Sequence, residues 1–164
     1  KNILARVSQI SIGLIGNMRG IIWAMDTQND SLDSLLGYMR QYVRTFLDDN
    51  AIEAQIQMPT DCPTVSLSGQ YRHHVMLTVK ECLNNILKHA AASRVTVHVE
   101  IGENLVIRIG DNGKGFDLAE RLGSGKGLRT TAKRMESIHG SIEWRRNADR
   151  GMTAVLSAPI PKNA

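Results

Sequence analysis

The predicted fold is arranged around residues 70–91, QYRHHVMLTVKECLNNILKHAA, which read as one helix of about six turns. At about 100° per residue, polar and apolar side chains separate onto opposite sides of this helix. The apolar side, which we expect in the core, carries Met76, Val79, Leu83, Ile86 and Ala90. The polar stripe carries Glu81, Asn85, Lys88 and His89.

This polar stripe suits a magnesium polyphosphate. The amide oxygen of Asn85 is a ligand that Mg²⁺ accepts, and the ammonium group of Lys88 is a point charge for phosphate. A solvated helix face with charges placed by chance is the plainer interpretation, and the helix by itself favours it. The choice therefore depends on the rest of the chain.

Composition indicates a soluble globular protein. The 164 residues are 42% hydrophobic and 22% charged, and the formal net charge is +4. The basic excess is small and scattered and aromatics make up only 4%, so binding to nucleic acid is not favoured. Cys62 and Cys82 lack the spacing of a metal or redox site, and we expect a reduced, cytoplasmic compartment. No signal peptide or membrane span is recognisable, and the chain reads as a fragment of a longer protein, one that we expect to be membrane-anchored.

The first residues predict a bundle helix. Spacings of three and four connect a heptad seam made of Leu4, Val7, Ser11, Leu14, Met18, Ile21 and Met25. Such a seam requires partner helices, and packing on the chain's own domain is the alternative. We therefore expect residues 1–28 to be the end of a dimerisation hairpin and residues 29–164 to form a separate domain.

The remaining pattern predicts an α+β fold. A helix at about 32–49 precedes a half-buried strand at 51–58, and strand pairs follow at 94–101 with 104–109 and at 141–146 with 153–158. A helix at 128–139 is expected to end at Gly140, in the C′ position. Paired strands predict a largely antiparallel sheet with helices on one face.

Two glycine-rich motifs follow the central helix. Asp111-Asn-Gly113-Lys-Gly115 leaves the end of a strand, where the carboxylate could accept a hydrogen bond from a ligand amino group and the glycines would let the backbone approach that ligand. Gly123-Ser-Gly125-Lys126-Gly127 precedes the helix that begins near Leu128, which suits a phosphate cradle of backbone N–H groups. Taken singly, an ordinary turn is the better explanation of the first motif, and a flexible surface loop explains the second motif equally well.

Taken together, the motifs resemble those of sensor histidine kinases. Glu81-x-x-x-Asn85-x-x-Lys88-His89 resembles the N box, Asp111-x-Gly113-x-Gly115 and Gly125-x-Gly127-Leu128 are similar to the two glycine boxes, and Gly151-Met-Thr153 resembles the closing glycine-threonine. The sequence ECLNNILKHA and the short loop between the boxes look most like the subfamily that signals to helix-turn-helix response regulators.

The resemblance implies a Bergerat ATP-binding fold, which is a two-layer α/β sandwich, and ATP and Mg²⁺ as cofactors. It implies that Asn85 coordinates Mg²⁺, that Lys88 and His89 contact phosphate, and that Glu81 orients or deprotonates the attacking group. It also implies that Asp111 binds the adenine amine with support from Thr153. Binding to the glycine motifs would involve Gly113, Gly115, Gly125, Lys126, Gly127 and Leu128.

In this family the protein is a homodimeric protein-histidine kinase that passes its phosphoryl group to a response-regulator receiver domain. The family's acidic-flanked acceptor histidine has no match here, which puts autophosphorylation of this chain in doubt but not nucleotide binding. Two alternatives stay open: an anti-sigma-type serine kinase of the same fold, and a non-catalytic dimerisation module with a degenerate nucleotide site.

Overall fold

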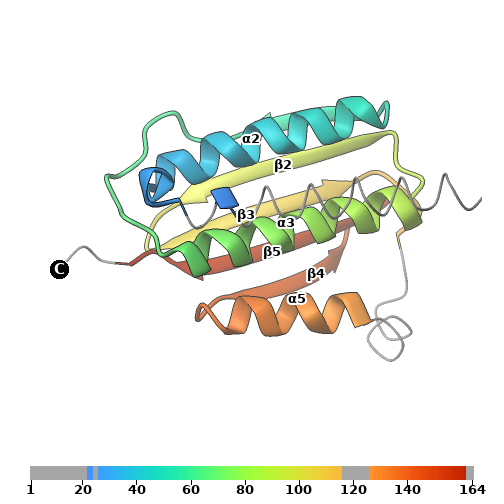
Figure 1. The fold of residues 1–164 in the computed structure, drawn as a ribbon. Coiled ribbons are helices and arrows are strands. Elements are labelled where there is room, and N and C mark those ends of the chain that lie inside the picture. Colours follow the sequence, from blue (N-terminus) through green and yellow to red (C-terminus); the bar gives the residue numbers. More distant parts are fainter. Residues whose placement is uncertain (1–21, 24–25, 116–125, 162–164) are drawn as a thin grey trace, which may run out of the picture.

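The computed structural model describes residues 22–23, 26–115 and 126–161, and its elements form two layers, a sheet and a layer of helices (Figure 1). The elements are, in chain order, η1 (Thr27–Asn29), α2 (Leu32–Asp49), β1 (Glu53–Gln57), α3 (Gly69–His89), β2 (Arg94–Ile101), β3 (Asn104–Asp111), α5 (Lys126–Glu136), β4 (Ser141–Arg146) and β5 (Met152–Pro159). The α+β prediction of a two-layer sandwich is confirmed.

The sheet has five strands in the order β1-β2-β3-β5-β4. The pairs β2–β3, β3–β5 and β4–β5 are antiparallel, as the strand pairs in the sequence predicted. β1 instead pairs with β2 in parallel, with Glu53 opposite Arg94. The reason is the connection: α3 crosses over between these strands, and a crossover of this kind returns the chain in the same direction.

Helices α2, α3 and α5 all cover the same face of the sheet (Figure 1). Apolar residues recur in α2 at the spacing of one helix face, and Leu32, Leu35, Leu36, Met39, Val43 and Leu47 are buried. The apolar side predicted for the central helix is also buried, at Met76, Val79, Leu83, Ile86 and Ala90. Helices α2 and α3 each begin at a serine cap: the side chain of Ser31 accepts from Ser34 N, and that of Ser68 accepts from Tyr71 N.

The helix near the second glycine motif begins and ends earlier than expected. α5 spans Lys126–Glu136 and not residues 128–139, because its first residues, Lys126 and Gly127, carry no apolar periodicity that a sequence pattern could detect. The expected ending at Gly140 also differs. His139 takes the left-handed conformation, with φ of 58°, and Gly140 N donates to Met135 O at 2.9 Å.

The heptad seam of residues 4–25 lies outside the described residues, so its partners stay a prediction. Ile22 and Trp23 are described and helical, and Trp23 packs against the core cluster. Among the described residues, no helix has the length and apolar character that crossing a membrane requires.

Candidate functional site

A pocket lies between α3 and the sheet, where the two glycine motifs were expected to act. Its lining comes from α3, β3, β4, β5 and the segment after β3, and consists of Cys82, Asn85, Ile86, His89, Ala90, Ile109, Asp111, Gly115, Trp144, Met152 and Ala154. Most of these side chains are apolar. Burial raises the pKa of the Cys82 thiol well above its usual range, so this residue contributes an uncharged wall.

Asp111 is the buried carboxylate of this pocket. It is the last residue of β3 and is 7% exposed. Burial raises the pKa of its carboxyl, and the hydrogen bonds donated by Gly113 N (2.7 Å, to Oδ1) and Met152 N (3.3 Å, to Oδ2) oppose that rise. A carboxylate has about four lone-pair sites, so Asp111 keeps acceptor capacity for a further donor in the pocket.

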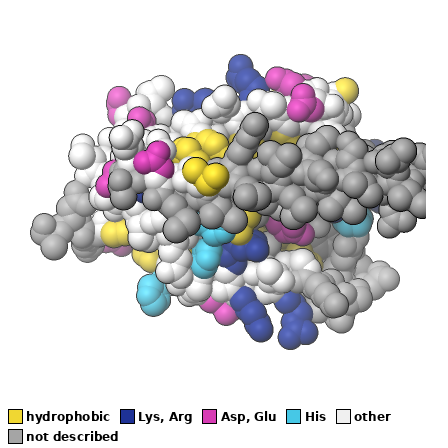
Figure 2. All heavy atoms as spheres, viewed as in Figure 1, with side chains coloured by type: hydrophobic (Ala, Val, Ile, Leu, Met, Phe, Trp, Pro, Cys, Tyr) yellow, Lys and Arg dark blue, Asp and Glu magenta, His cyan; other side chains and the backbone are white. Residues whose placement is uncertain are grey.

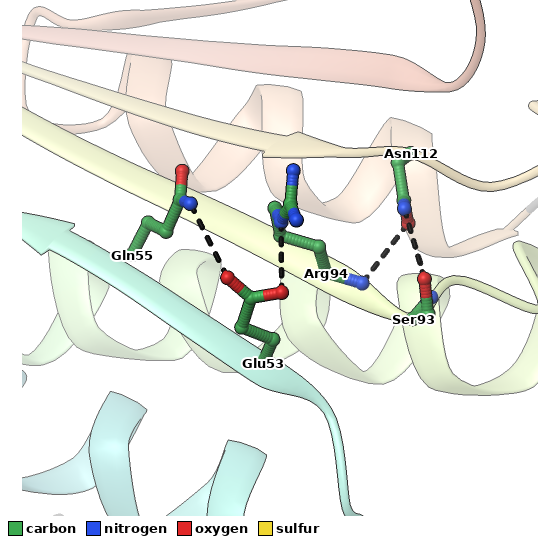
Figure 3. A network of polar contacts seen from close by, with 5 residues as sticks. All are labelled: Glu53, Gln55, Ser93, Arg94 and Asn112. Carbon is green, nitrogen blue, oxygen red and sulfur yellow. Dashed lines mark hydrogen bonds and ion pairs between the residues drawn. The ribbon is translucent and has the colours of Figure 1, made fainter.

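The turn after Asp111 is held by a polar network on the open face of the sheet (Figure 3). Asn112 Oδ1 accepts from the backbone N–H groups of Ser93 and Arg94, both at 3.0 Å, and Asn112 Nδ2 donates to Ser93 Oγ at 2.9 Å. Arg94 in turn forms an ion pair with Glu53 at 2.9 Å. These contacts join the end of β3 to the start of β2 and so hold the turn that follows Asp111.

Gly113 allows a close approach of two backbone segments, and its contact with a ligand stays a prediction. A Cβ at this position would collide with the carbonyl oxygen of Ala90, at the end of α3, and Lys114 N donates to the same oxygen at 2.9 Å. Gly115 does line the pocket, as expected, and has a φ of 69°. The first glycine motif therefore joins the end of α3 to the pocket.

The polar stripe of α3 divides into three parts. Asn85 and His89 line the pocket, Lys88 is exposed, and Glu81 lies one turn before Asn85, against α5. The amide nitrogen of Asn85 is buried without a hydrogen-bond partner among the described residues. A buried polar group without a partner costs about 1–3 kcal/mol, so this amide is suited to a group that a ligand brings.

The second glycine motif lies against Glu81 of α3. A Cβ on Gly127 would lie only 2.7 Å from Glu81 Oε1, so the absence of a side chain lets the carboxylate lie against the first turn of α5. Leu128 is buried and anchors this turn. Gly125 and the side chain of Lys126 lie outside the described residues. Figure 2 shows histidine and basic side chains gathered on the helix-covered face where α3 and α5 lie side by side.

Thr153 is not brought to the pocket. It lies on the opposite face of β5 from Met152 and Ala154, and its hydroxyl donates to Asn147 Oδ1 at 2.6 Å. Asn147 Nδ2 donates to the backbone oxygen of Asp111 at 2.9 Å. Thr153 thus reaches the Asp111 backbone through Asn147, and the Asp111 carboxylate itself accepts from Met152 N. The support of adenine binding by Thr153 stays a prediction.

Sequence reasoning missed the apolar wall of the pocket, chiefly Trp144, Met152 and Ala154. The signal for two of these residues was present. β5 alternates, and Met152 and Ala154 share the buried face of Leu156 and Ala158, whereas Thr153 falls between them. Nothing in the pattern of β4 marked Trp144, because tryptophan is common in half-buried strands.

These features define a class of protein. The family profile for histidine kinase-, DNA gyrase B-, and HSP90-like ATPases matches residues 70–162, from the start of α3 to beyond β5. The chain therefore belongs to this ATPase family, and its motifs are in the order that the resemblance to sensor histidine kinases required.

Named relatives agree with that resemblance. The chain is 30% identical over 153 residues to the signal transduction histidine-protein kinase/phosphatase DegS of Brevibacillus brevis, a match that covers 89% of this chain and 38% of the relative. It is 28% identical over 123 residues to the sensor histidine kinase LiaS of Bacillus subtilis, with 74% of this chain and 34% of the relative covered. The chain thus spans little more than a third of the length of these relatives.

The fold is also that of a solved kinase domain. The histidine kinase domain of a blue-light activated histidine kinase from Erythrobacter litoralis superposes with a TM-score of 0.67. The sequence identity is 17%, and the match covers 96% of this chain and 82% of that domain. The resemblance to sensor histidine kinases, drawn from the motifs, is confirmed by these relatives and by this fold.

Proposed function

We propose that this chain is the ATP-binding catalytic region of a sensor histidine kinase. It binds Mg-ATP, and in the longer protein the γ-phosphoryl group passes to a histidine and then to an aspartate of a response regulator. The observation that carries this proposal is the pocket: a buried carboxylate, Asp111, surrounded by apolar walls at the end of the helix that bears Asn85 and His89. Family membership supports ATP as the nucleotide.

The pocket is chemically matched to adenine. Asp111 is an acceptor in a largely apolar surrounding, and the exocyclic amine of adenine is a donor on an otherwise flat, apolar ring. Guanine presents a carbonyl oxygen at the same ring position, which a carboxylate repels. Ile109, Trp144, Met152 and Ala154 line the pocket and would enclose the ring and exclude water from this hydrogen bond.

The residues present fit a magnesium ion that is shared with the nucleotide. Within the described ranges, no group of three or more His, Cys, Asp or Glu side chains is arranged to hold a metal ion. Mg²⁺ commonly takes one or two protein oxygens and completes its shell with phosphates and water, and Asn85 offers such an oxygen at the pocket. When bound there, the ion would neutralise charge that develops on the phosphates.

The remaining residues of the site would act on the phosphates. His89 at the pocket and the exposed Lys88 would supply positive or donor groups, and residues 126–128 would supply N–H groups at the start of α5. Gly125 stays a predicted contributor to this cradle. Glu81, held against Gly127, orients or deprotonates the attacking nitrogen. Catalysis in this arrangement is mostly positioning and charge neutralisation.

The proposal includes the setting of the intact protein. Residues 1–28 would belong to a helical hairpin that forms a homodimer, and residues 29–164 to the catalytic domain. The partner in signalling would be a receiver domain and not nucleic acid. The domain would be cytoplasmic, in a protein that is membrane-anchored as a whole. Nothing on the described surface favours the serine-kinase or degenerate-site alternatives.

Equilibrium binding of nucleotides to the parent and to Asp111→Asn tests the assignment. We expect the parent to prefer ATP to GTP, and Asp111→Asn to bind ATP at least about tenfold more weakly with an unchanged circular dichroism spectrum. The lost charged hydrogen bond accounts for about 1.5–3 kcal/mol, and each 1.4 kcal/mol is about tenfold. Equal affinity of the parent for ATP and GTP would show that Asp111 does not read the base.

A further inference from the structure

Arg72 is a buried arginine outside the nucleotide pocket. It lies in the first turn of α3 and is only 2% exposed, which is unusual for a residue that cannot lose its charge. Its guanidinium donates to two backbone carbonyls in different connecting segments: Nη1 to Leu67 O at 3.0 Å, and Nη2 to Asp26 O at 3.1 Å. Arg72 therefore joins the start of α3 to the segment that follows the N-terminal helical residues.

Trp23 anchors the same segment from the other side. Its ring stacks on Tyr38 of α2, with centroids 4.1 Å apart and planes inclined by 10°. The guanidinium carbon of Arg72 lies 5.9 Å from the centroid of the Trp23 ring, within the range of a cation–π contact. Trp23 is thus held between α2 and the start of α3.

The segment between these anchors has its own internal order. Asp26 N donates to Ile22 O at 3.1 Å, and the Asp26 carboxylate accepts from Gln28 N at 3.0 Å. Further on, Leu67 N donates to Asp30 O at 2.6 Å, and Ser66 Oγ donates to Asp30 Oδ2 at 2.8 Å. Residues 26–30 are therefore held by hydrogen bonds among themselves and, at Asp30, by hydrogen bonds to Ser66 and Leu67 in the loop before α3.

We propose that Trp23 and Arg72 form a junction clamp that fixes Trp23 and residues 26–30 to the start of α3. Through it they act as positioning residues for phosphoryl transfer. α3 carries Glu81 and Asn85, so a clamp at its first turn ties these two residues to the segment through which an acceptor hairpin would be joined to the catalytic domain. A fixed connection of this kind raises the effective concentration of the acceptor nitrogen at the γ-phosphate. The positioning role rests on the proposed function, whereas the clamp itself does not.

The chemistry of Arg72 favours a clamp over simple core filling. An apolar side chain would fill the same space without burying a charge. A lysine would offer a single ammonium nitrogen to two carbonyl oxygens that lie in different segments. Only the planar guanidinium presents separate donors to both carbonyls while its face remains beside an aromatic ring. Both of these hydrogen bonds end on backbone carbonyls of connecting segments.

Amide hydrogen exchange tests the clamp in this chain. The variants are Trp23→Ala and Arg72→Lys, with Trp23→Phe to keep a stacking ring. Ile22→Ala is the matched control, because Ile22 is the neighbouring residue and is 66% exposed. We expect the amides of Asp26 and Asn29 to exchange at least about tenfold faster in Trp23→Ala and Arg72→Lys, with amides of β3 and β5 unchanged. The Phe and Ile22 variants should behave like the parent.

Unchanged exchange at Asp26 and Asn29 in both disruptive variants, or equal acceleration throughout β3 and β5, would overturn the clamp. Where the chain is joined to its acceptor hairpin, we expect these variants to lower kcat for autophosphorylation about fivefold or more and to leave KM for ATP unchanged. A higher KM, or an unchanged or raised kcat, would overturn the positioning role. A parent that binds no ATP would contradict the proposed function and leave the exchange result intact.

Discussion

Burial of the Asp111 carboxylate suits the proposed hydrogen bond to adenine but lowers the stability of the folded protein. Burial raises the pKa of its carboxyl, which means that the folded protein holds the carboxyl proton more tightly than the unfolded chain does. The stabilisation from the protonated form is fully present at low pH and is lost as the pH rises through the folded-state pKa. At neutral pH the charged Asp111 therefore lowers the free energy of unfolding of the nucleotide-free protein.

This gives a pH prediction for the nucleotide-free chain. Relative to Asp111→Asn, which cannot titrate, the parent should gain stability as the pH falls from 7 towards about 4, the range just above the ordinary pKa of an aspartate. Denaturant unfolding of both proteins across this range measures the difference, in which other titrating groups cancel. A difference that is independent of pH, or that favours the variant at low pH, would contradict the assignment of a raised pKa to Asp111.

Asn85 should matter through the metal and not through the fold. Its amide nitrogen has no partner among the described residues, so Asn85→Ala removes a buried polar group as well as an oxygen ligand. We expect the melting temperature to stay the same or rise slightly, because removing an unpaired buried group is favourable by about 1 kcal/mol.

The binding of ATP by Asn85→Ala should lose its dependence on magnesium, which titrations with and without the ion measure. Asn84→Ala, the neighbouring half-buried position of α3 that does not line the pocket, is the control and should retain the dependence. If Asn85→Ala and the parent respond to magnesium in the same way, Asn85 is not a ligand of the ion.

At the scale of elements, the position of α5 against Glu81 depends on the absence of a side chain at Gly127. Gly127→Ala would bring a Cβ to 2.7 Å from Glu81 Oε1, and the carboxylate end of that flexible side chain would have to move. Alanine is the better helix former, by up to about 1 kcal/mol and less at a helix start. We expect the variant to be as stable as the parent and to bind ATP within about twofold, yet to transfer phosphate to a separate acceptor hairpin about tenfold more slowly.

Gly37→Ala is the matched control for that experiment. Gly37 lies inside α2, and apart from the backbone of its own helix turn no atom of the described residues lies within 4 Å of the position that a Cβ would occupy. This change should stabilise the chain without altering phosphate transfer. Transfer by Gly127→Ala at the parental rate would mean that the position of Glu81 against α5 has no catalytic role.

The elements also show what a sequence can and cannot predict. α3 was predictable because a helix that is buried on one side repeats its apolar residues, and its predicted core residues are all buried. The face of Thr153 was not found by motif matching, because a motif gives a position along the chain and only the alternation of β5 gives a side of the sheet. The parallel β1–β2 pair depends on a crossover, which strand patterns do not reveal.

At the scale of the whole molecule, the two faces of the sheet have different structural roles. The helix-covered face holds the core and the pocket, and the open face holds ion pairs and amide contacts that fix the turn at Asp111, as Figure 3 shows. Asp111 lies where these two sets of contacts meet. Its two neighbours along the motif, Asn112 and Gly113, therefore have structural tasks that the motif alone did not suggest.

The molecule as a whole sets a limit on what the isolated chain can do. Phosphoryl transfer requires an acceptor nitrogen near the γ-phosphate and in line with the leaving oxygen. Residues 1–28 contain no histidine, and all five histidines of the chain lie within residues 29–164. His73 and His74 lie in the first two turns of α3, His98 lies in β2, and His139 follows α5.

His89 is the only one of these histidines that lines the pocket in the described part of the chain, and we assign it to phosphate binding. The chain should therefore bind Mg-ATP but form no acid-labile phosphohistidine after incubation with labelled ATP. Addition of a separate acceptor hairpin is expected to give label on the hairpin and not on the chain. Stoichiometric acid-labile label on the chain alone, mapped to any of its histidines, would refute the assignment of His89 and the absence of an acceptor from this sequence.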